Sequence, residues 1–198
     1  MKRLLDLLIA VPATVLSAPL ILVCCVLIRL ESRGSPIFRQ TRAGLHGEPF
    51  EIYKLRTMVQ GAQQLGAGDA ISGADDFRLT RCGRWLRRYS LDELPNLWNV
   101  LRGEMSIVGP RPTLPSQVAQ YTEHQRIRLE VPPGITGWAQ INGRASLTWP
   151  ERIELDIYYV QHRSLALDLA ILARTFAILG NGEDLYHEGE GGGWVNPS

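Results

Sequence analysis

Cysteine is scarce in this sequence: the 198 residues include three, and two of them, Cys24 and Cys25, are adjacent within an apolar run. This arrangement excludes a disulfide-rich secreted domain, and the chain has no C-x-x-C pair for a metal or redox centre. An excess of charge is also lacking, because the formal net charge is +1, so bulk charge gives no reason to expect a nucleic-acid partner. No repeat with a period of roughly 20–50 residues is visible. These absences favour one ordinary domain in a reducing, cytosolic setting, with an appendage.

The longest uncharged stretch lies near the N-terminus, where 22 consecutive residues, Leu7–Ile28, are mostly apolar. As a straight helix this stretch would measure about 33 Å, close to the thickness of the hydrocarbon core of a bilayer. Basic residues flank it on both sides, and because positive charge marks the cytoplasmic side, we expect both ends on that side. The stretch is too long for the apolar region of a secretory signal peptide.

Two prolines, Pro12 and Pro19, lie within this apolar stretch. Each removes a backbone hydrogen bond and bends a helix, and the hydroxyl of Ser17 could return a hydrogen bond to a freed carbonyl. Two arrangements stay open: a kinked helix that spans the bilayer, or a re-entrant hairpin that leaves through the leaflet it entered. Prolines are tolerated in spanning helices, so they do not decide between the two.

Polar and apolar patterning predicts a mostly helical α+β fold with a short β-hairpin, placed after the apolar membrane segment. The predicted strands are 35–44 and 48–58, with a turn at 44–47, and the predicted helices are 78–89, 91–101, 113–131, 149–159 and 165–179. The predicted loops are 60–76, interpreted as a mobile lid, and 132–144, which is rich in Gly and Pro. The expected organisation is a membrane segment over 1–30, a domain with interfacial helices over 31–180, and a flexible tail over 181–198.

Two neighbouring carboxylates, Asp92 and Glu93, follow a run of arginines. The segment from Ser90 to Glu93 matches a capping box, S-x-x-E, so the ordinary interpretation of the pair is a helix N-terminus. Pro95 would then fall at the fifth helical position, which indicates an irregular first turn or a later start. In the alternative interpretation the helix N-terminus keeps Asp92 ionised, and an ionised carboxylate is a nucleophile toward phosphorus.

Arginines near the pair supply the positive charge that a phosphate site needs. They are Arg81, Arg84, Arg87 and Arg88 before the pair and Arg111 after it, the last fixed between two prolines. A planar guanidinium on a restricted backbone suits phosphate binding, and Mg²⁺ with oxygen ligands would complete the charge balance. The competing interpretation of any single arginine is a solvated helix face, or a face on anionic lipid headgroups, because only one or two can reach one phosphate.

Three segments together carry a more specific signal than any one of them. They are "YSLDELPNLWNVLRGEMSIVGPRP", "VPPGITGWAQINGR" and "IELDIYYVQHRSLALDL", in that order behind the proline-containing apolar N-terminus. With them the chain closely resembles the monotopic phosphoglycosyl transferases, bacterial sugar transferases that begin glycan assembly on a lipid carrier. The likeness covers Lys2 to Leu179, and the chain is similar to the short form of that family.

The resemblance implies a reaction and its partners. Members move a phosphosugar from a UDP-sugar to polyprenyl (undecaprenyl) phosphate and release UMP, in the first membrane step of bacterial glycoconjugate assembly. By resemblance, Asp92 attacks the sugar-linked phosphorus and forms a covalent intermediate, Mg²⁺ lies near Asp92, and Glu93 orients Asp92, binds the metal or accepts a proton. A re-entrant N-terminal helix places the catalytic domain on the cytoplasmic face of the inner membrane, among its lipids. An N-acetylated or deoxyamino sugar is the favoured donor, and a homo-oligomer stays open.

Five further residues are candidates for phosphate or nucleotide binding. They are Arg87, Arg88, Arg111, Arg144 and Asp168. Arg144 lies in the Gly-rich loop, which could equally be a structural loop packed around Trp138, and Asp168 is an acid in an apolar helix. One departure from the family concerns its Ser-Pro pair at the membrane helix break, since this chain has Ala18-Pro19 with Ser17 one residue earlier. Pro12 is expected to contribute to the break in the membrane helix.

Two rival functions were weighed against this resemblance. A membrane-bound phosphatase with an aspartyl nucleophile would show a D-x-D pattern, which is missing around Asp92. A membrane-anchored scaffold would use the segment from Ser90 to Glu93 only as a helix cap.

Overall fold

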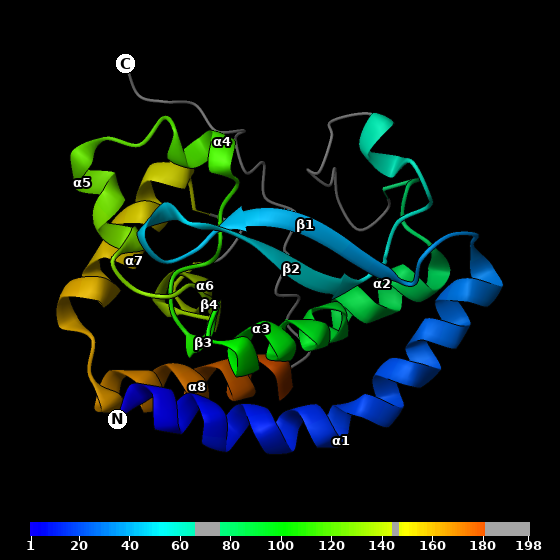
Figure 1. The fold of residues 1–198 in the computed structure, drawn as a ribbon, viewed down its shortest axis with the longest axis horizontal. Helices are drawn as coiled ribbons and strands as arrows, with labels where there is room; N and C mark the ends of the chain where they lie inside the picture. Colours follow the sequence, from blue (N-terminus) through cyan, green and yellow to red (C-terminus); the bar gives the residue numbers. More distant parts are fainter. Residues whose placement is uncertain (66–75, 144–146, 181–198) are drawn as a thin grey trace.

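The computed structural model describes residues 1–65, 76–143 and 147–180, and its elements confirm the mostly helical α+β class (Figure 1). The helices are α1 (Lys2–Glu31), α2 (Arg81–Arg88), α3 (Leu97–Arg102), α4 (Pro115–Val118), α5 (Glu123–Arg126), α6 (Trp138–Ile141), α7 (Trp149–His162) and α8 (Leu165–Gly180). The 3-10 helices are η1 (Leu45–Gly47), η2 (Ala62–Gln64), η3 (Leu91–Asn96) and η4 (Ile127–Leu129). The strands are β1 (Ile37–Ala43), β2 (Pro49–Leu55), β3 (Ser106–Val108) and β4 (Gly134–Thr136), which form two pairs. The predicted tail 181–198 and most of the predicted lid lie outside the described residues.

Helix α1 is continuous over 30 residues, and by length and composition it is apolar enough to cross a membrane. Both prolines lie inside it, and it bends in the plane of Figure 1 without an interruption. The predicted helix–break–helix is therefore corrected to one curved helix. Local hydroxyls support the bend, because Thr14 Oγ1 donates to Ala10 O at 2.7 Å and Ser17 Oγ to Thr14 O at 3.3 Å. Two prolines thus curve this helix but do not end it.

Both ends of α1 are bound to the rest of the chain by polar contacts. Near the start, the buried carboxylate of Asp6 accepts hydrogen bonds from Ser106 Oγ and Ile107 N, both at 2.9 Å. At the other end, Glu31 accepts from the backbone N–H groups of Arg81 (2.6 Å) and Cys82 (2.9 Å) at the start of α2. Both ends of helix α1 are therefore attached to the same domain.

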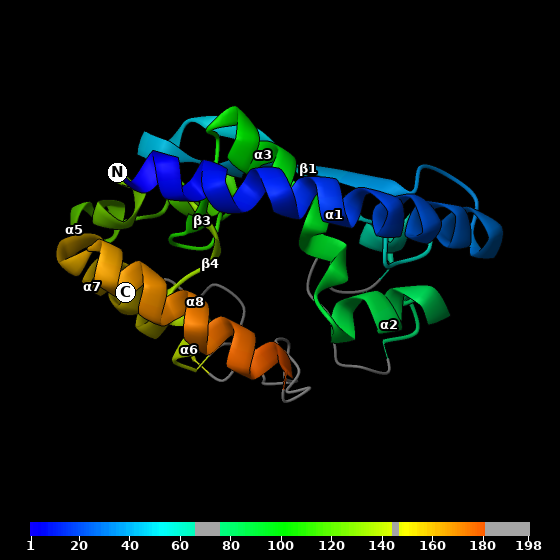
Figure 2. The ribbon, with the colours of Figure 1, turned by 90° about the horizontal axis from the view of Figure 1, so that it is seen from below.

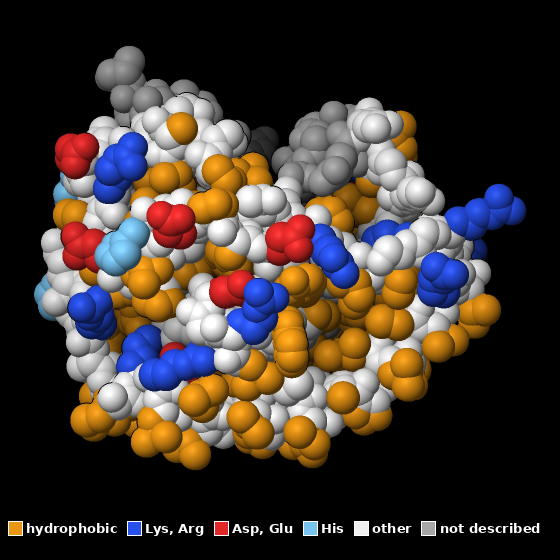
Figure 3. Space-filling model, viewed as in Figure 1, with side chains coloured by type: hydrophobic (Ala, Val, Ile, Leu, Met, Phe, Trp, Pro, Cys, Tyr) orange, Lys and Arg blue, Asp and Glu red, His pale blue; other side chains and the backbone are white. Residues whose placement is uncertain are grey.

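The side of α1 that faces away from the domain is apolar and exposed. Hydrophobic side chains line the lower margin of the molecule, where α1 runs (Figure 3). The most exposed of them are Leu4, Leu8, Val15, Leu16, Leu22 and Leu30, each more than half exposed. Helix α8 lies on the same lower side (Figures 1 and 2) and adds Leu169 and Phe176, which are 50% and 70% exposed. This surface is suited to contact with lipid.

The β-hairpin agrees with the prediction and supports the carboxylate-bearing segment. Strands β1 and β2 pair antiparallel from Ile37 opposite Leu55 to Ala43 opposite Pro49. The outer edge of β2 is covered by two amides that follow the carboxylate pair: Asn96 Oδ1 accepts from Tyr53 N at 3.1 Å, and Asn99 Nδ2 donates to Glu51 O at 2.6 Å. These bonds fix the position of η3 and α3 along the strand.

A second strand pair was not predicted. Strands β3 and β4 are parallel, with Ser106 opposite Gly134 and Val108 opposite Thr136. The backbones approach so closely beyond β3 that a Cβ at Gly109 would lie 2.5 Å from the carbonyl oxygen of Pro132. A core of aliphatic side chains from α1, α3, β3, α7 and α8 surrounds this pair.

Three predicted elements differ in the structure. The predicted helix 113–131 is three short helices, α4, α5 and η4, and the predicted loop 132–144 contains β4 and α6. The predicted helix 91–101 is a 3-10 turn followed by α3. Contacts with distant segments accompany these differences: β4 pairs with β3, Thr113 O accepts from Ala43 N, and the side chains of Asn96 and Asn99 bind the backbone of β2.

Candidate active site

The carboxylate pair lies on the 3-10 helix η3, and the predicted capping box is wrong. Ser90 has φ 52° and ψ 24°, the left-handed region that a non-glycine residue rarely adopts, and its side chain caps nothing. The Glu93 side chain points elsewhere, to Lys54 and Arg111. Pro95 lies within η3, so the first turn is irregular as the sequence indicated. A non-glycine residue held in this conformation is a feature that recurs at functional sites.

Asp92 is buried, with 4% of its surface exposed. Its Oδ1 atom has no hydrogen-bond partner among the described residues. Burial raises the pKa of Asp92 to about 6, against the opposing charges of Lys54, Arg87 and Arg111, while the Glu93 carboxylate adds to the rise. A buried carboxylate oxygen without a partner is ready to bind a cation or to attack an electrophile.

Glu93 is held differently, by two cationic side chains from distant segments. Its Oε1 accepts from Lys54 Nζ on β2 at 2.7 Å and from a guanidinium nitrogen of Arg111 at 2.8 Å. Burial lowers the pKa of Lys54, while the Glu93 carboxylate counteracts that shift. Lys54 was not predicted from the sequence, since tertiary contacts between β2 and η3, such as that of Tyr53 with Asn96, place this strand residue beside η3. The structure thus places Arg111 and a lysine at the carboxylate pair, and phosphate binding by Arg111 stays a prediction.

The upstream arginines separate into two groups. Arg87 donates from Nε to Thr57 Oγ1 at 2.8 Å, and its charge acts on Asp92. Arg88 is exposed, with its guanidinium 5.9 Å from the ring centre of Tyr89. Arg81 and Arg84 are exposed as well. The structure therefore brings Arg87 toward the pair and leaves Arg88 at the surface, as the solvated-face interpretation predicts.

The other two predicted site residues are Arg144 and Asp168. Arg144 lies outside the described residues. Asp168 is buried, and its carboxylate accepts from Lys2 Nζ at 2.8 Å and from the Tyr159 hydroxyl at 2.7 Å. In this structure Asp168 joins α8 to the start of α1, and its contact with a phosphate or a nucleotide stays a prediction.

The fit of a magnesium ion depends on the oxygen ligands that the carboxylate pair offers. Among the described residues, no group of three or more His, Cys, Asp or Glu side chains converges. Mg²⁺ in phosphate chemistry is commonly held by one or two carboxylates, with phosphate oxygens and waters as its other ligands. The Oδ1 atom of Asp92, buried and without a hydrogen-bond partner there, is a suitable ligand of this kind. The residues present fit Mg²⁺ held jointly with a bound diphosphate.

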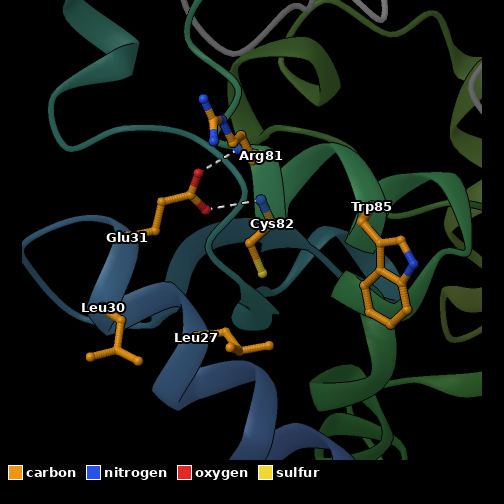
Figure 4. A pocket seen from close by; sticks show the side chains of 6 residues that line it. All are labelled: Leu27, Leu30, Glu31, Arg81, Cys82 and Trp85. Carbon is orange, nitrogen blue, oxygen red and sulfur yellow. Dashed lines mark hydrogen bonds between the residues drawn. The ribbon is translucent and has the colours of Figure 1, made fainter.

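A pocket of about 580 Å³ lies between the end of α1 and α2, and it does not include the carboxylate pair (Figure 4). It is lined by Leu27, Leu30, Glu31, Arg81, Cys82 and Trp85. The lining is mostly apolar, and Leu30 and Trp85 are 79% and 47% exposed. The pocket therefore continues the exposed apolar side of α1 onto α2.

Comparisons with known proteins agree with this geometry. The family model described as bacterial sugar transferase matches residues 1–182. The Bacillus subtilis protein named "Uncharacterized sugar transferase EpsL" is 48% identical over 176 residues, covering 88% of this chain and 85% of that protein. The UDP-glucose:undecaprenyl-phosphate glucose-1-phosphate transferase of Caulobacter vibrioides is 44% identical over 193 residues, covering 93% and 72%. The UDP-N-acetylgalactosamine-undecaprenyl-phosphate N-acetylgalactosaminephosphotransferase of Aeromonas hydrophila is 43% identical over 180 residues, covering 88% and 42%.

The likeness extends over both parts of the molecule described above. The family model includes the apolar helix α1 as well as the segment with Asp92, Glu93 and Arg111. Because the match covers nearly the whole chain, this protein is a transferase and belongs to the bacterial sugar transferase family.

Proposed function

We propose that this protein transfers a phosphosugar from a UDP-sugar to polyprenyl phosphate, giving a polyprenyl diphosphate sugar and UMP. The main support is the contrast within the pair: Asp92 keeps an oxygen without a hydrogen-bond partner among the described residues, while Glu93 binds two cationic side chains. The names of the Caulobacter and Aeromonas relatives specify this kind of transfer for those proteins. In a bacterium it would be the first membrane step of glycoconjugate assembly, such as O-antigen, capsule, exopolysaccharide or glycoprotein.

In the first step, a carboxylate oxygen of Asp92 attacks the phosphorus that carries the sugar. The bond from that phosphorus to the UMP oxygen breaks, UMP leaves with the electron pair, and the phosphosugar stays on Asp92. Lys54, Arg87 and Arg111 surround the carboxylates, so they are placed to stabilise the negative charge that develops on UMP. Mg²⁺, when bound at Asp92, would neutralise diphosphate charge.

In the second step, a phosphate oxygen of the polyprenyl phosphate attacks the same phosphorus. The bond to Asp92 breaks, and the carboxylate is regenerated. The acceptor phosphate is largely ionised at neutral pH, so its attack needs no strong base. Glu93 is already bound to Lys54 and Arg111, and we assign it the role of orienting these cations.

The attachment of α1 supports a monotopic arrangement on the cytoplasmic face of the inner membrane. Asp6 binds β3 and Glu31 binds the start of α2, so both ends of the apolar helix belong to one domain. A helix that crossed the bilayer would place its two ends on opposite faces. Helix α1 is therefore proposed to dip into one leaflet and return, with α8 beside it at the interface.

An assay of UMP release tests the reaction. The purified protein is given Mg²⁺ and a panel of UDP-sugars, with and without undecaprenyl phosphate. UMP formed only with the lipid supports transfer, whereas phosphate release from a single substrate would support a phosphatase instead. The donor panel includes UDP-glucose and UDP-N-acetylhexosamines, because the names of the relatives are divided between such donors. An N-acetylated or deoxyamino sugar remains our prediction.

Cysteine labelling tests the topology. The three native cysteines are replaced, and single cysteines are introduced at Lys2 and at Arg33, on either side of the apolar stretch. An impermeant maleimide is expected to label both positions only from the cytoplasmic side. Labelling of residue 2 from the outside would instead establish a spanning helix.

A further inference from the structure

Arg128 is a buried arginine outside the carboxylate pair whose contacts lead back to it. It lies on η4 with 3% of its surface exposed. Its guanidinium donates to Asp156 Oδ2 on α7 (3.1 Å from Nε, with a second bond from a terminal nitrogen) and to the Tyr121 hydroxyl at 2.5 Å. The same side chain donates to the backbone carbonyl of Arg111 at 3.0 Å. One guanidinium thus connects α7 to the segment whose side chain binds Glu93.

The segment around Arg111 needs such external support. Pro110 and Pro112 have no N–H group, so the segment cannot donate backbone hydrogen bonds at those positions. It is held through its carbonyls: Pro110 O accepts from Gly134 N at 2.8 Å, and Arg111 O accepts from Arg128. Thr113 O accepts from Ala43 N at 2.8 Å. Of these three contacts, the one at Arg111 comes from a side chain.

The charges of Arg128 and Asp156 are costly to bury. Asp156 is 2% exposed, and its Oδ1 has no hydrogen-bond partner among the described residues. A buried ion pair is often no more stabilising than well-packed apolar side chains of the same volume. What apolar side chains could not do is donate a hydrogen bond to the Arg111 carbonyl. The hydrogen bond to the Arg111 carbonyl, rather than the stability of the fold, explains why residue 128 is an arginine.

We propose that Arg128, oriented by Asp156 and Tyr121, is a positioning residue that fixes the backbone of Arg111, so that the Arg111 guanidinium meets Glu93 and the diphosphate of the donor. This inference rests on the proposed transfer reaction for its effect on catalysis. Its structural part, the restraint of the segment from Gly109 to Thr113, does not depend on that reaction.

A double-mutant cycle tests the catalytic part. Arg128→Lys is expected to lower kcat for UMP release about tenfold in the wild-type background, because a lysine cannot make all of these contacts. In an Arg111→Lys background the same change is expected to alter kcat less than about twofold, because the residue that it positions is already impaired. Equal fold-changes in the two backgrounds would overturn the proposal. Absence of lipid-dependent UMP release from the wild type would instead refute the proposed function.

Amide hydrogen exchange tests the structural part without any turnover. Arg128→Lys is expected to speed exchange in peptides covering Gly109 to Thr113, and unchanged exchange there would also overturn the proposal. Arg78→Lys is the matched control, because Arg78 forms another buried pair, with Asp76 at 2.6 Å. That control should leave exchange at Gly109–Thr113 unchanged and should show the same fold-change in kcat in both backgrounds. If Arg128→Lys does not fold, Asp156→Asn weakens the pairing that orients the guanidinium and is measured by the same criteria.

Discussion

Two adjacent carboxylates in this protein meet opposite electrostatic surroundings. Glu93 has its charge matched by Lys54 and Arg111 in direct contact, whereas Asp92 Oδ1 is buried without a hydrogen-bond partner among the described residues. A matched carboxylate is a weak nucleophile because its lone pairs are engaged, and a desolvated one is more reactive. The surroundings therefore favour our proposal that Asp92 forms the bond and that Glu93 places the cations.

Replacement of Asp92 by asparagine separates chemistry from folding. We expect Asp92→Asn to lower UMP release by about 10³-fold or more, because the amide cannot form the covalent intermediate. Burial raises the pKa of Asp92 from 3.8 to about 6, so the folded state holds this proton more tightly than the unfolded chain. In EDTA, stability should fall as pH rises from about 4 to about 6, and at pH 7.5 the variant should be more stable by on the order of 2 kcal/mol.

Thermal melts at pH 4 and pH 7.5 check this sign. The stability difference between Asp92→Asn and the wild type should be much smaller at pH 4, where the carboxyl is protonated in the folded state and partly protonated in the unfolded chain. Added Mg²⁺ should raise the melting temperature of the wild type only. If Asp92→Asn kept wild-type turnover, the assignment of Asp92 as the nucleophile would be wrong.

Lys54 was not identified from the sequence, and its replacement probes the cationic side of the site. Lys54→Met leaves Glu93 with one partner fewer, so we expect a loss of about 1–3 kcal/mol in the free energy of unfolding. Turnover should fall about 10- to 100-fold, since charge developing on UMP would lose a donor. Denaturant unfolding and UMP release measure the two effects, with Lys54→Arg as the charge-preserving control. An unchanged kcat in Lys54→Met would show that Lys54 does not contribute to the reaction.

Sequence patterning predicted the elements that depend on local periodicity. Helices α7 and α8 and the hairpin β1–β2 have the expected positions, because each shows its period within a single segment. Strands β3 and β4 have three residues each and pair across distant parts of the chain, so no local pattern marks them. The capping box failed for a related reason, since Glu93 finds its partners on β2 and beyond β3 rather than at Ser90. Asp92, Glu93 and Arg111 could be predicted because the family motif contains all three.

Helix α2 carries Arg87 to the site, and a glycine sets how closely it packs. A Cβ at Gly83 would lie 1.9 Å from the carbonyl oxygen of Thr57, the residue whose hydroxyl binds Arg87. We expect Gly83→Ala to push α2 away from Thr57, to destabilise the fold by about 1–3 kcal/mol and to lower turnover. Gly180→Ala is the control, since a Cβ there meets nothing within 4 Å. Melting temperature and UMP release measure these effects. If Gly83→Ala changed neither of them, the close packing would be contradicted.

At the scale of the whole molecule, α1 acts as part of the catalytic domain and as its lipid contact. Its inner side buries Asp6 and Ala10 in the domain, while Leu16 and Leu30 on its outer side are 77% and 79% exposed. Anchoring to lipid and positioning of the active site therefore use different sides of one helix.

A variant at Asp6 should separate these two roles. Asp6→Asn loses a charge-assisted contact to Ser106 and to Ile107 N, so the domain should lose about 1–3 kcal/mol and UMP release should fall. The exposed apolar side is unchanged, so the protein should stay in the membrane fraction after a carbonate wash. Glu154→Gln, at a carboxylate that is 60% exposed and bound to His124, is the control and should be neutral in both measurements. Release of Asp6→Asn from membranes would contradict this separation.

The attachment of both ends of α1 to one domain also bears on the bilayer that the enzyme tolerates. A spanning helix has a hydrophobic length that must match the membrane, and mismatch tilts or distorts it. In the monotopic arrangement that we propose, a helix that starts and finishes on one domain has no such length to match, so its depth is set from one membrane surface only. Turnover in vesicles of short-chain and long-chain phosphatidylcholine should therefore be nearly equal, and the protein should suit membranes of different thickness without any change in α1.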